Sequence, residues 1–297
     1  MMKALVLFYL LINNIISSPY TAPNKWQDAD ASWLSYKIYD GVNTLNTDSG
    51  YVFHSHESDK NGAYALWKQK NSGDCYIVIR GTKTLDDVLE DINVYEYYDS
   101  EIDVNVHFGV RKRAQFILED IGDKLNVCTQ DIIVTGHSLG GSIAYYLYLI
   151  YIKRHFLDWL EFLKSAKFKA VLFGTPALTT KSGINWIAGR DDYVNFYVYG
   201  RDWIPSIIKK VQGSTFFQLI SQTLSNLGIR LAQNAYNTVQ KVSYGNHYPG
   251  NKYLLLFGSF IKIPLSTISP PNILNLDGIN DHKNMRKVVD VLTHDVW

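Results

Sequence analysis

Short apolar runs and longer stretches with apolar residues at every third or fourth position alternate along most of this chain. The short runs are rich in Val, Ile and aromatic residues, which is typical of buried strands, whereas the longer periodic stretches predict helices. Strands are expected at 51–53, 62–68, 75–80, 131–135, 170–173 and 193–199, and helices at 26–39, 84–95, 110–125, 142–165 and 214–241. A hairpin is expected over 241–257, around Pro249-Gly250-Asn251.

This alternation predicts an α/β fold with a mainly parallel central sheet, helices on both faces and a C-terminal antiparallel hairpin. A chain of 297 residues with 46% hydrophobic residues is long enough for one sizeable core. No internal repeat, low-complexity linker or change of composition marks a boundary. We therefore expect a single domain over residues 19–297.

The hexapeptide Gly136-His137-Ser138-Leu139-Gly140-Gly141 lies between a predicted strand and a predicted helix. Gly-x-Ser-x-Gly in this setting is typical of a nucleophile elbow, a sharp turn that exposes a serine hydroxyl above the sheet edge. The helix N-terminus that follows supplies positive potential where negative charge develops in a reaction. The alternative is a glycine-containing turn without chemistry, and the two flanks favour the elbow.

The first residues resemble a secretory signal peptide. Lys3 precedes the apolar run 4–12, and small residues follow before Pro19. The apolar run is short for a membrane span. We expect residues 1–18 to be a signal peptide of a secreted protein. A buried N-terminal element and an uncleaved membrane anchor remain as alternatives.

Charge and cysteine content narrow the function further. The formal net charge of +1 argues against nucleic acid as a partner. No group of Cys and His has zinc-site spacing, so no metal is expected. Cys75 and Cys128 both precede predicted strands. A disulfide between two neighbouring strand starts is one interpretation, and two free buried thiols are the alternative that we favour.

Several ordered motifs between Trp33 and His282 resemble those of the class 3 lipases, α/β-hydrolases that include the fungal triacylglycerol lipases. The motifs that carry this resemblance are Ile77-Val78-Ile79-Arg80-Gly81-Thr82, Val106-His107-Phe108-Gly109-Val110, the segment from Thr135 to Gly141, Phe173-Gly174-Thr175-Pro176, Arg201-Asp202-Trp203-Ile204-Pro205 and Asp281-His282. The resemblance implies the α/β-hydrolase fold and a Ser-His-Asp triad.

By this resemblance Ser138 is the nucleophile, Asp202 the acid and His282 the base. The order Ser, then acid, then His is that of the fold. Asp202 is preferred to Asp191 and Asp192, because only Asp202 follows the strand and continues with Ile-Pro. His247 and His294 also follow Asp202 in the chain. The family's hairpin histidine precedes its catalytic one, and His294 lies near the chain end, so His282 is favoured.

The oxyanion hole implied by the resemblance consists of the Leu139 N–H and Thr82, through its N–H and its hydroxyl. Arg80 is interpreted as structural. The segment after Thr82 is where the family carries its lid, and four residues of this segment share one face of the predicted helix: Leu85, Val88, Leu89 and Ile92. A second set of apolar residues within 206–241 either contacts lipid or covers the sheet.

The resemblance therefore implies a carboxylic-ester hydrolase that acts on neutral lipids such as triacylglycerol at a lipid–water interface. Phospholipase A1 or another lipid esterase is the alternative on the same residues, since a triad does not select a head group. A lipase-like lipid-binding protein without turnover is a third interpretation. Peripheral contact with a membrane or a lipid droplet is compatible with this substrate class. No metal or organic cofactor is implied, and the sequence leaves the oligomeric state open.

Overall fold

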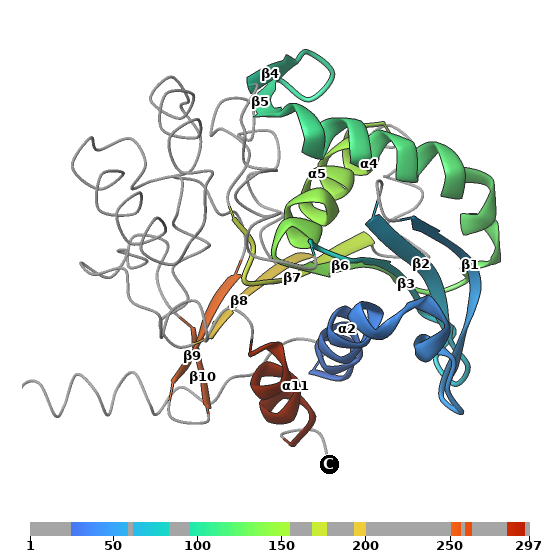
Figure 1. Cartoon of the computed structure of the whole chain (residues 1–297), viewed down its shortest axis with the longest axis vertical. Coiled ribbons are helices and arrows are strands. Elements are labelled where there is room, and N and C mark those ends of the chain that lie inside the picture. Colours follow the sequence, from blue (N-terminus) through green and yellow to red (C-terminus); the bar gives the residue numbers. More distant parts are fainter. Residues whose placement is uncertain are drawn as a thin grey trace, which may run out of the picture.

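The computed structural model describes residues 25–58, 62–82, 96–154, 168–176, 193–199, 251–256, 259–262 and 284–294. Its centre is an eight-stranded sheet with the order β1-β2-β3-β6-β7-β8-β9-β10 (Figure 1). The strands are β1 (Gly50–Ser58), β2 (Gly62–Gln69), β3 (Cys75–Ile79), β6 (Ile132–His137), β7 (Phe168–Phe173), β8 (Val194–Tyr199), β9 (Asn251–Leu256) and β10 (Ser259–Lys262). A separate ribbon pairs β4 (Glu96–Asp99) with β5 (Val104–His107).

The middle of the sheet is parallel and its two sides are antiparallel. Strands β3, β6, β7, β8 and β9 run in the same direction. On one side β1 and β2 are added antiparallel to β3, and on the other side β10 is antiparallel to β9. The predictions of a mainly parallel sheet and of a C-terminal antiparallel hairpin are therefore confirmed.

Helices cover both faces, as expected. Helices α4 (Phe108–Ile121) and α5 (Leu139–Arg154) pack on one face, and α2 (Lys25–Lys37) and α11 (Met285–His294) pack on the other (Figure 1). Strand β2 shows why two cores form. Its residues alternate between the faces, with Tyr64 and Leu66 in one core and Ala65 and Trp67 in the other. Within the described residues, no helix is long and apolar enough to cross a bilayer.

Two elements near the C-terminus differ from the sequence expectation. Asn251, which we expected in a turn, is the first residue of β9 and pairs with Asn195 of β8 in parallel. The hairpin that the structure describes pairs Leu256 with Ser259, later in the chain. Asn251 of the Pro-Gly-Asn signal is thus part of a strand, and the first half of the expected hairpin, 241–250, lies outside the described residues. The helix α11 was missed, although its buried residues Met285, Val288, Val289 and Leu292 have helical spacing.

Cys75 and Cys128 form a disulfide with a Cα–Cα distance of 5.7 Å, so the favoured interpretation of two free thiols is wrong. The bond joins the first residue of β3 to the loop before β6. These strands are parallel neighbours, with Cys75 opposite Ile132. Parallel pairing therefore brings the two cysteines together at one edge of the sheet, although 53 positions separate them in the chain.

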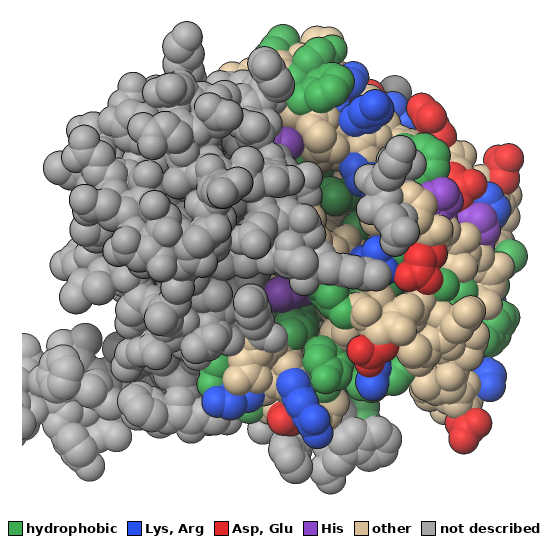
Figure 2. Space-filling view, viewed as in Figure 1, with side chains coloured by type: hydrophobic (Ala, Val, Ile, Leu, Met, Phe, Trp, Pro, Cys, Tyr) green, Lys and Arg blue, Asp and Glu red, His purple; other side chains and the backbone are tan. Residues whose placement is uncertain are grey.

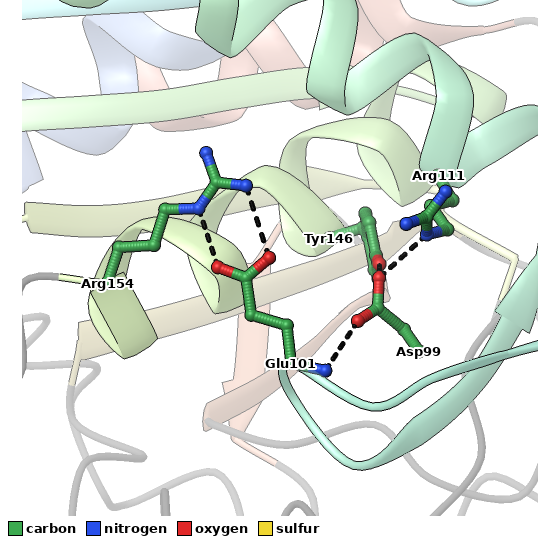
Figure 3. Close-up of polar contacts among 5 residues, drawn as sticks. All are labelled: Asp99, Glu101, Arg111, Tyr146 and Arg154. Atoms are coloured by element: carbon green, nitrogen blue, oxygen red, sulfur yellow. Dashed lines mark hydrogen bonds and ion pairs between the residues drawn. The ribbon is translucent and has the colours of Figure 1, made fainter.

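The β4–β5 ribbon, which the sequence did not reveal, is tied to two helices by one buried and one partly exposed acidic side chain. The Asp99 carboxylate is 2% exposed. It accepts hydrogen bonds from Tyr146 of α5 and, at 2.7 Å, from Arg111 of α4 (Figure 3). Glu101 in the ribbon's turn accepts two hydrogen bonds from Arg154 at the end of α5, at 2.6 and 3.1 Å. These bonds fix the ribbon against the helix pair.

These contacts also set the charge state of Asp99. Burial alone would favour the neutral acid, but the donors Tyr146 and Arg111 and the Glu101 backbone N–H together hold the pKa of Asp99 below its usual value. The ribbon is therefore anchored by a carboxylate that stays charged.

On the described part of the face in Figure 2, acidic and basic side chains are interspersed.

Two aspartates should affect stability in opposite directions as pH changes. Burial raises the pKa of Asp30 to about 6, despite a hydrogen bond from Tyr76. Its contribution to stability is therefore present at acid pH and lost as pH rises through about 6. For Asp120, a hydrogen bond from Tyr64 is the largest cause that lowers the pKa to about 2. Its contribution is present at neutral pH and lost as pH falls toward that value.

We predict that Asp30→Asn melts at a higher temperature than the parent chain above pH about 7, and that this advantage shrinks below pH about 5. Asp120→Asn is the matched control and should melt at a lower temperature near neutral pH, with a deficit that shrinks on acidification. Thermal unfolding of the three proteins across this pH range checks both trends. Equal pH dependence of the two variants would contradict the assignment.

Candidate active site

Ser138 occupies the sharp turn between β6 and α5, and its φ of +56° places it in the left-handed region. A non-glycine residue adopts this conformation at a cost of about 1–2 kcal/mol, so the surroundings must hold it there. The Ser138 N–H donates to the Phe173 carbonyl of β7 at 2.9 Å, and the Ser138 carbonyl accepts from the Gly141 N–H at 2.9 Å. The predicted elbow is thus present in the geometry.

Glycines around Ser138 are required by close backbone contact. A Cβ on Gly136 would lie 2.6 Å from the Gly140 carbonyl carbon and 2.7 Å from the Ile79 oxygen. A Cβ on Gly140 would overlap the same Ile79 oxygen and lie 2.7 Å from the Gly81 nitrogen. The start of α5 therefore lies directly on the end of β3, without a side chain between them.

This contact brings the segment that carries Thr82 close to the start of α5, where Leu139 lies. Leu139 is the first residue of α5, where backbone N–H groups have no partner within the helix. Gly81 and Thr82, which we call the oxyanion loop, follow β3, and an ideal Cβ on Gly81 would lie 3.3 Å from the Gly140 nitrogen. The Thr82 hydroxyl is shielded from solvent and has no hydrogen-bond partner among the described residues.

The turn after β7 supports the elbow from the other side. Ser142 Oγ of α5 donates to the Pro176 carbonyl at 2.7 Å, and the Thr175 side chain lies where a Cβ on Gly141 would be. The Phe-Gly-x-Pro motif therefore packs on α5. His107, from the motif around Gly109, caps α4 by accepting a hydrogen bond from the Val110 N–H at 3.3 Å. These two motifs thus have structural roles.

One side chain at the site was not found from the sequence. The Tyr39 hydroxyl lies 3.2 Å from His137 Nδ1 and accepts a hydrogen bond from the Gly81 N–H. Tyr39 lies in the 3-10 turn Ile38–Asp40 that ends α2. No local pattern distinguishes this tyrosine from others in the chain, because the contact arises only when α2 packs below the elbow.

The remaining predicted residues lie outside the described part of the chain. These are Asp202 and His282, the rivals Asp191, Asp192 and His247, the lid residues Leu85, Val88, Leu89 and Ile92, and the segment 206–241. The backbone of His294 is described as the end of α11, but its side chain is not. Ser138 itself is 2% exposed.

The described elements nevertheless bring the neighbours of the acid and base together. Strand β8 ends at Tyr199, three positions before Asp202, and α11 begins three positions after His282. The Lys287 ammonium of α11 lies 5.4 Å from the centre of the Tyr199 ring. Because β8 is parallel to β6 and β7, it ends at the same sheet edge as Ser138. Among the residues that the structure describes, no cluster of His, Cys, Asp and Glu could hold a metal ion.

Comparison with known proteins agrees with this geometry. The family model described as Lipase (class 3) matches residues 76–212, and the expected resemblance to this family is confirmed. No curated protein matches the sequence. Solved structures of fungal lipases resemble the chain and show that it has the α/β-hydrolase fold.

Three of the similar structures are fungal. The Rhizomucor miehei lipase propeptide complex has a TM-score of 0.60 at 14% identity and covers 88% of this chain and 80% of its own. Lipase II from Rhizopus niveus has a TM-score of 0.56 at 16% identity, with 79% and 82% covered. A triacylglycerol lipase from Penicillium expansum has a TM-score of 0.56 at 13% identity, with 82% and 84% covered.

The close backbone contact leads to a prediction about stability. Gly140→Ala should lower the free energy of unfolding by about 1–3 kcal/mol or more, because its methyl group overlaps the end of β3. Gly122→Ala is the matched control, since a Cβ there meets nothing within 4 Å, and it should leave stability unchanged or slightly higher. Denaturant unfolding of both variants checks this difference. Equal stabilities would show that the contact is looser than described.

Proposed function

We propose that this chain is a serine carboxylic-ester hydrolase that cleaves acyl esters of neutral lipids through an acyl-enzyme intermediate. The observation that carries this proposal is Ser138, held at positive φ against the oxyanion loop. A serine in a left-handed turn is strained, and packing alone does not require a serine there. We therefore attribute the strain at Ser138 to function, with N–H donors beside the buried hydroxyl. The class 3 lipase match over residues 76–212 supports the reaction class.

The proposed reaction has two halves. His282 removes the proton from Ser138 Oγ as the oxygen attacks the ester carbonyl, and then donates that proton to the leaving alcohol. The Leu139 and Thr82 N–H groups stabilise the tetrahedral oxyanion, each contribution being worth about 100- to 1000-fold in rate. Water, deprotonated by the same histidine, then cleaves the acyl-enzyme and releases the fatty acid.

Asp202 is proposed to orient the imidazole of His282 and to stabilise its charged form without taking the proton. The contact between Lys287 and Tyr199 supports this pair, because these residues flank the two candidates in sequence. An extended residue spans at most about 3.6 Å. The few residues between each flank and its candidate are therefore enough to reach one edge of the sheet.

The proposed substrates are neutral acylglycerols, since one of the similar structures is a triacylglycerol lipase. Phospholipase A1 or another lipid esterase is the second candidate. Relative rates on triacylglycerol, phosphatidylcholine and short p-nitrophenyl esters separate the two. A lipid-binding protein without turnover would have no use for a strained serine, and the chain retains serine, acid and histidine candidates at 138, 202 and 282.

We also propose that the protein is secreted and that residues 1–18 are its signal peptide, with an uncleaved anchor as the alternative. The Cys75–Cys128 disulfide supports an oxidising compartment. Extension of the single domain to all of 19–297 stays a prediction.

Covalent labelling tests Ser138 as the nucleophile. A fluorophosphonate probe should label the wild-type chain and leave Ser138→Ala unlabelled, because the probe reacts only with an activated serine. Ser142→Ala is the matched control. Its hydroxyl is buried four residues away but donates to the Pro176 carbonyl, so this variant should still be labelled. Labelling quantified by gel fluorescence decides the matter, and absence of labelling in all three proteins would favour the non-catalytic interpretation.

The dependence of the rate on a lipid–water interface tests the proposed lid. Burial of Leu85, Val88, Leu89 and Ile92 in a closed state would be worth roughly 6–12 kcal/mol as an upper bound. The rate on a short-chain ester should therefore rise sharply when the ester exceeds its solubility and an interface forms. Replacing Leu85 and Leu89 by Ser should weaken this rise and leave the rate on dissolved ester unchanged or higher. A hyperbolic rate curve through the solubility limit would argue against the lid.

A further inference from the structure

Three groups meet at the oxyanion loop: the backbone N–H of Gly81 in the loop, the Tyr39 phenol and the His137 imidazole. The phenol oxygen accepts a hydrogen bond from Gly81 and lies 3.2 Å from His137 Nδ1. The Tyr39 and His137 rings meet edge to face, with centroids 5.9 Å apart. Tyr39 thus contacts both the oxyanion loop and His137, the residue before Ser138.

Gly81 is confined on both sides. An ideal Cβ at this position would lie 2.6 Å from the Tyr39 hydroxyl and 2.6 Å from the His137 carbonyl oxygen. The backbone of Gly81 is therefore held between the phenol and the elbow, and Thr82 follows it directly. A shift of the Gly81 peptide moves the Thr82 N–H as well, because the peptide unit between them is planar.

The phenol is suited to hold both neighbours at once. Its oxygen accepts from the Gly81 N–H, so its own hydrogen is available to His137 Nδ1 when that nitrogen is unprotonated. Burial raises the pKa of Tyr39 well above its usual value, although the Gly81 N–H and nearby Arg80 oppose this shift. The phenol therefore remains a neutral donor and acceptor across the pH range in which proteins are folded.

We propose that Tyr39 is a positioning residue that fixes the oxyanion loop relative to Ser138 through its bonds to Gly81 and His137. This inference rests on the proposed hydrolase function. Oxyanion donors act because they are fixed in advance where charge develops, and a displacement of about 1 Å can cost 100-fold in rate. Tyr39 lies in the 3-10 turn that follows α2. Helix α2 and helix α5 pack on opposite faces of the sheet, so α2 takes part in arranging the donors across β3.

The test is Tyr39→Phe, which keeps the ring and its packing and removes the hydroxyl. On a dissolved p-nitrophenyl ester, kcat should fall about tenfold with KM unchanged, because the lost effect operates in the transition state. Affinity for an aryl boronic acid should fall by the same factor. The boron forms a bond to Ser138 Oγ, and one of its hydroxyl oxygens then occupies the oxyanion position.

Two tyrosines serve as controls. Tyr36→Phe removes a hydroxyl from α2, the helix just before the Tyr39 turn, and this hydroxyl makes no hydrogen bond among the described residues. Tyr76→Phe removes a buried hydroxyl that donates to Asp30 at 3.3 Å, away from the elbow. Both variants should retain kcat and boronic acid affinity, even where Tyr76→Phe melts at a lower temperature. An equal fall of kcat in Tyr76→Phe would overturn the proposal, because general loss of stability would then explain it.

Unchanged kcat and boronic acid affinity in folded Tyr39→Phe would also overturn it. Should this variant fail to fold, hydrogen exchange of the Gly81 amide in the wild-type chain gives the decision. Slow exchange supports the bond to the phenol, and fast exchange overturns it. A wild-type chain that neither hydrolyses esters nor reacts with a fluorophosphonate would overturn the proposed function and this inference together. An active wild type with an unaffected Tyr39→Phe overturns the inference alone.

Discussion

Direct backbone contact between the end of β3 and the start of α5 is the constraint on which the rest of the site depends. Gly136 and Gly140 leave no side chain at this contact, and the Ile79 carbonyl occupies the space that either Cβ would need. Because the two backbones meet, Ser138 is forced into a left-handed turn and the oxyanion loop lies beside it. The same contact thus positions both the proposed nucleophile and the proposed oxyanion donors.

The opposite edge of the sheet keeps this arrangement in register. The disulfide joins the beginning of β3 to the loop before β6, and Lys169 of β7 forms an ion pair with Asp131, next to β6. Gln27 of α2 donates to Asp131 at 2.9 Å and to Asp74 at 3.1 Å. A sliding of β3, β6 or β7 by one residue would break these bonds and move the ends of the same strands, where the proposed chemistry takes place.

The parts of this molecule that were predictable from sequence are those governed by local pattern. The apolar runs predicted β3, β6 and β7, and the glycine spacing around Ser138 predicted the elbow, because each depends on residues close in the chain. The disulfide between Cys75 and Cys128 depended on which strands become neighbours. Tyr39 depended on how α2 packs against the sheet. Neither the disulfide nor the Tyr39 contact can be predicted from the spacing of residues that are close in the sequence. Helix α11 had helical spacing but was short and close to the chain end.

The conformation of Ser138 has a consequence for the history of such chains. Glycine adopts a φ near +56° without strain, and asparagine or aspartate adopts it more readily than serine does. Serine at this position is therefore at a conformational disadvantage relative to these residues. In a lineage where the hydroxyl ceased to be used, selection for stability would favour replacement at this one position first. If Ser138 is the nucleophile as proposed, the amino acid at this position in relatives of the chain would show whether their hydrolysis is still under selection.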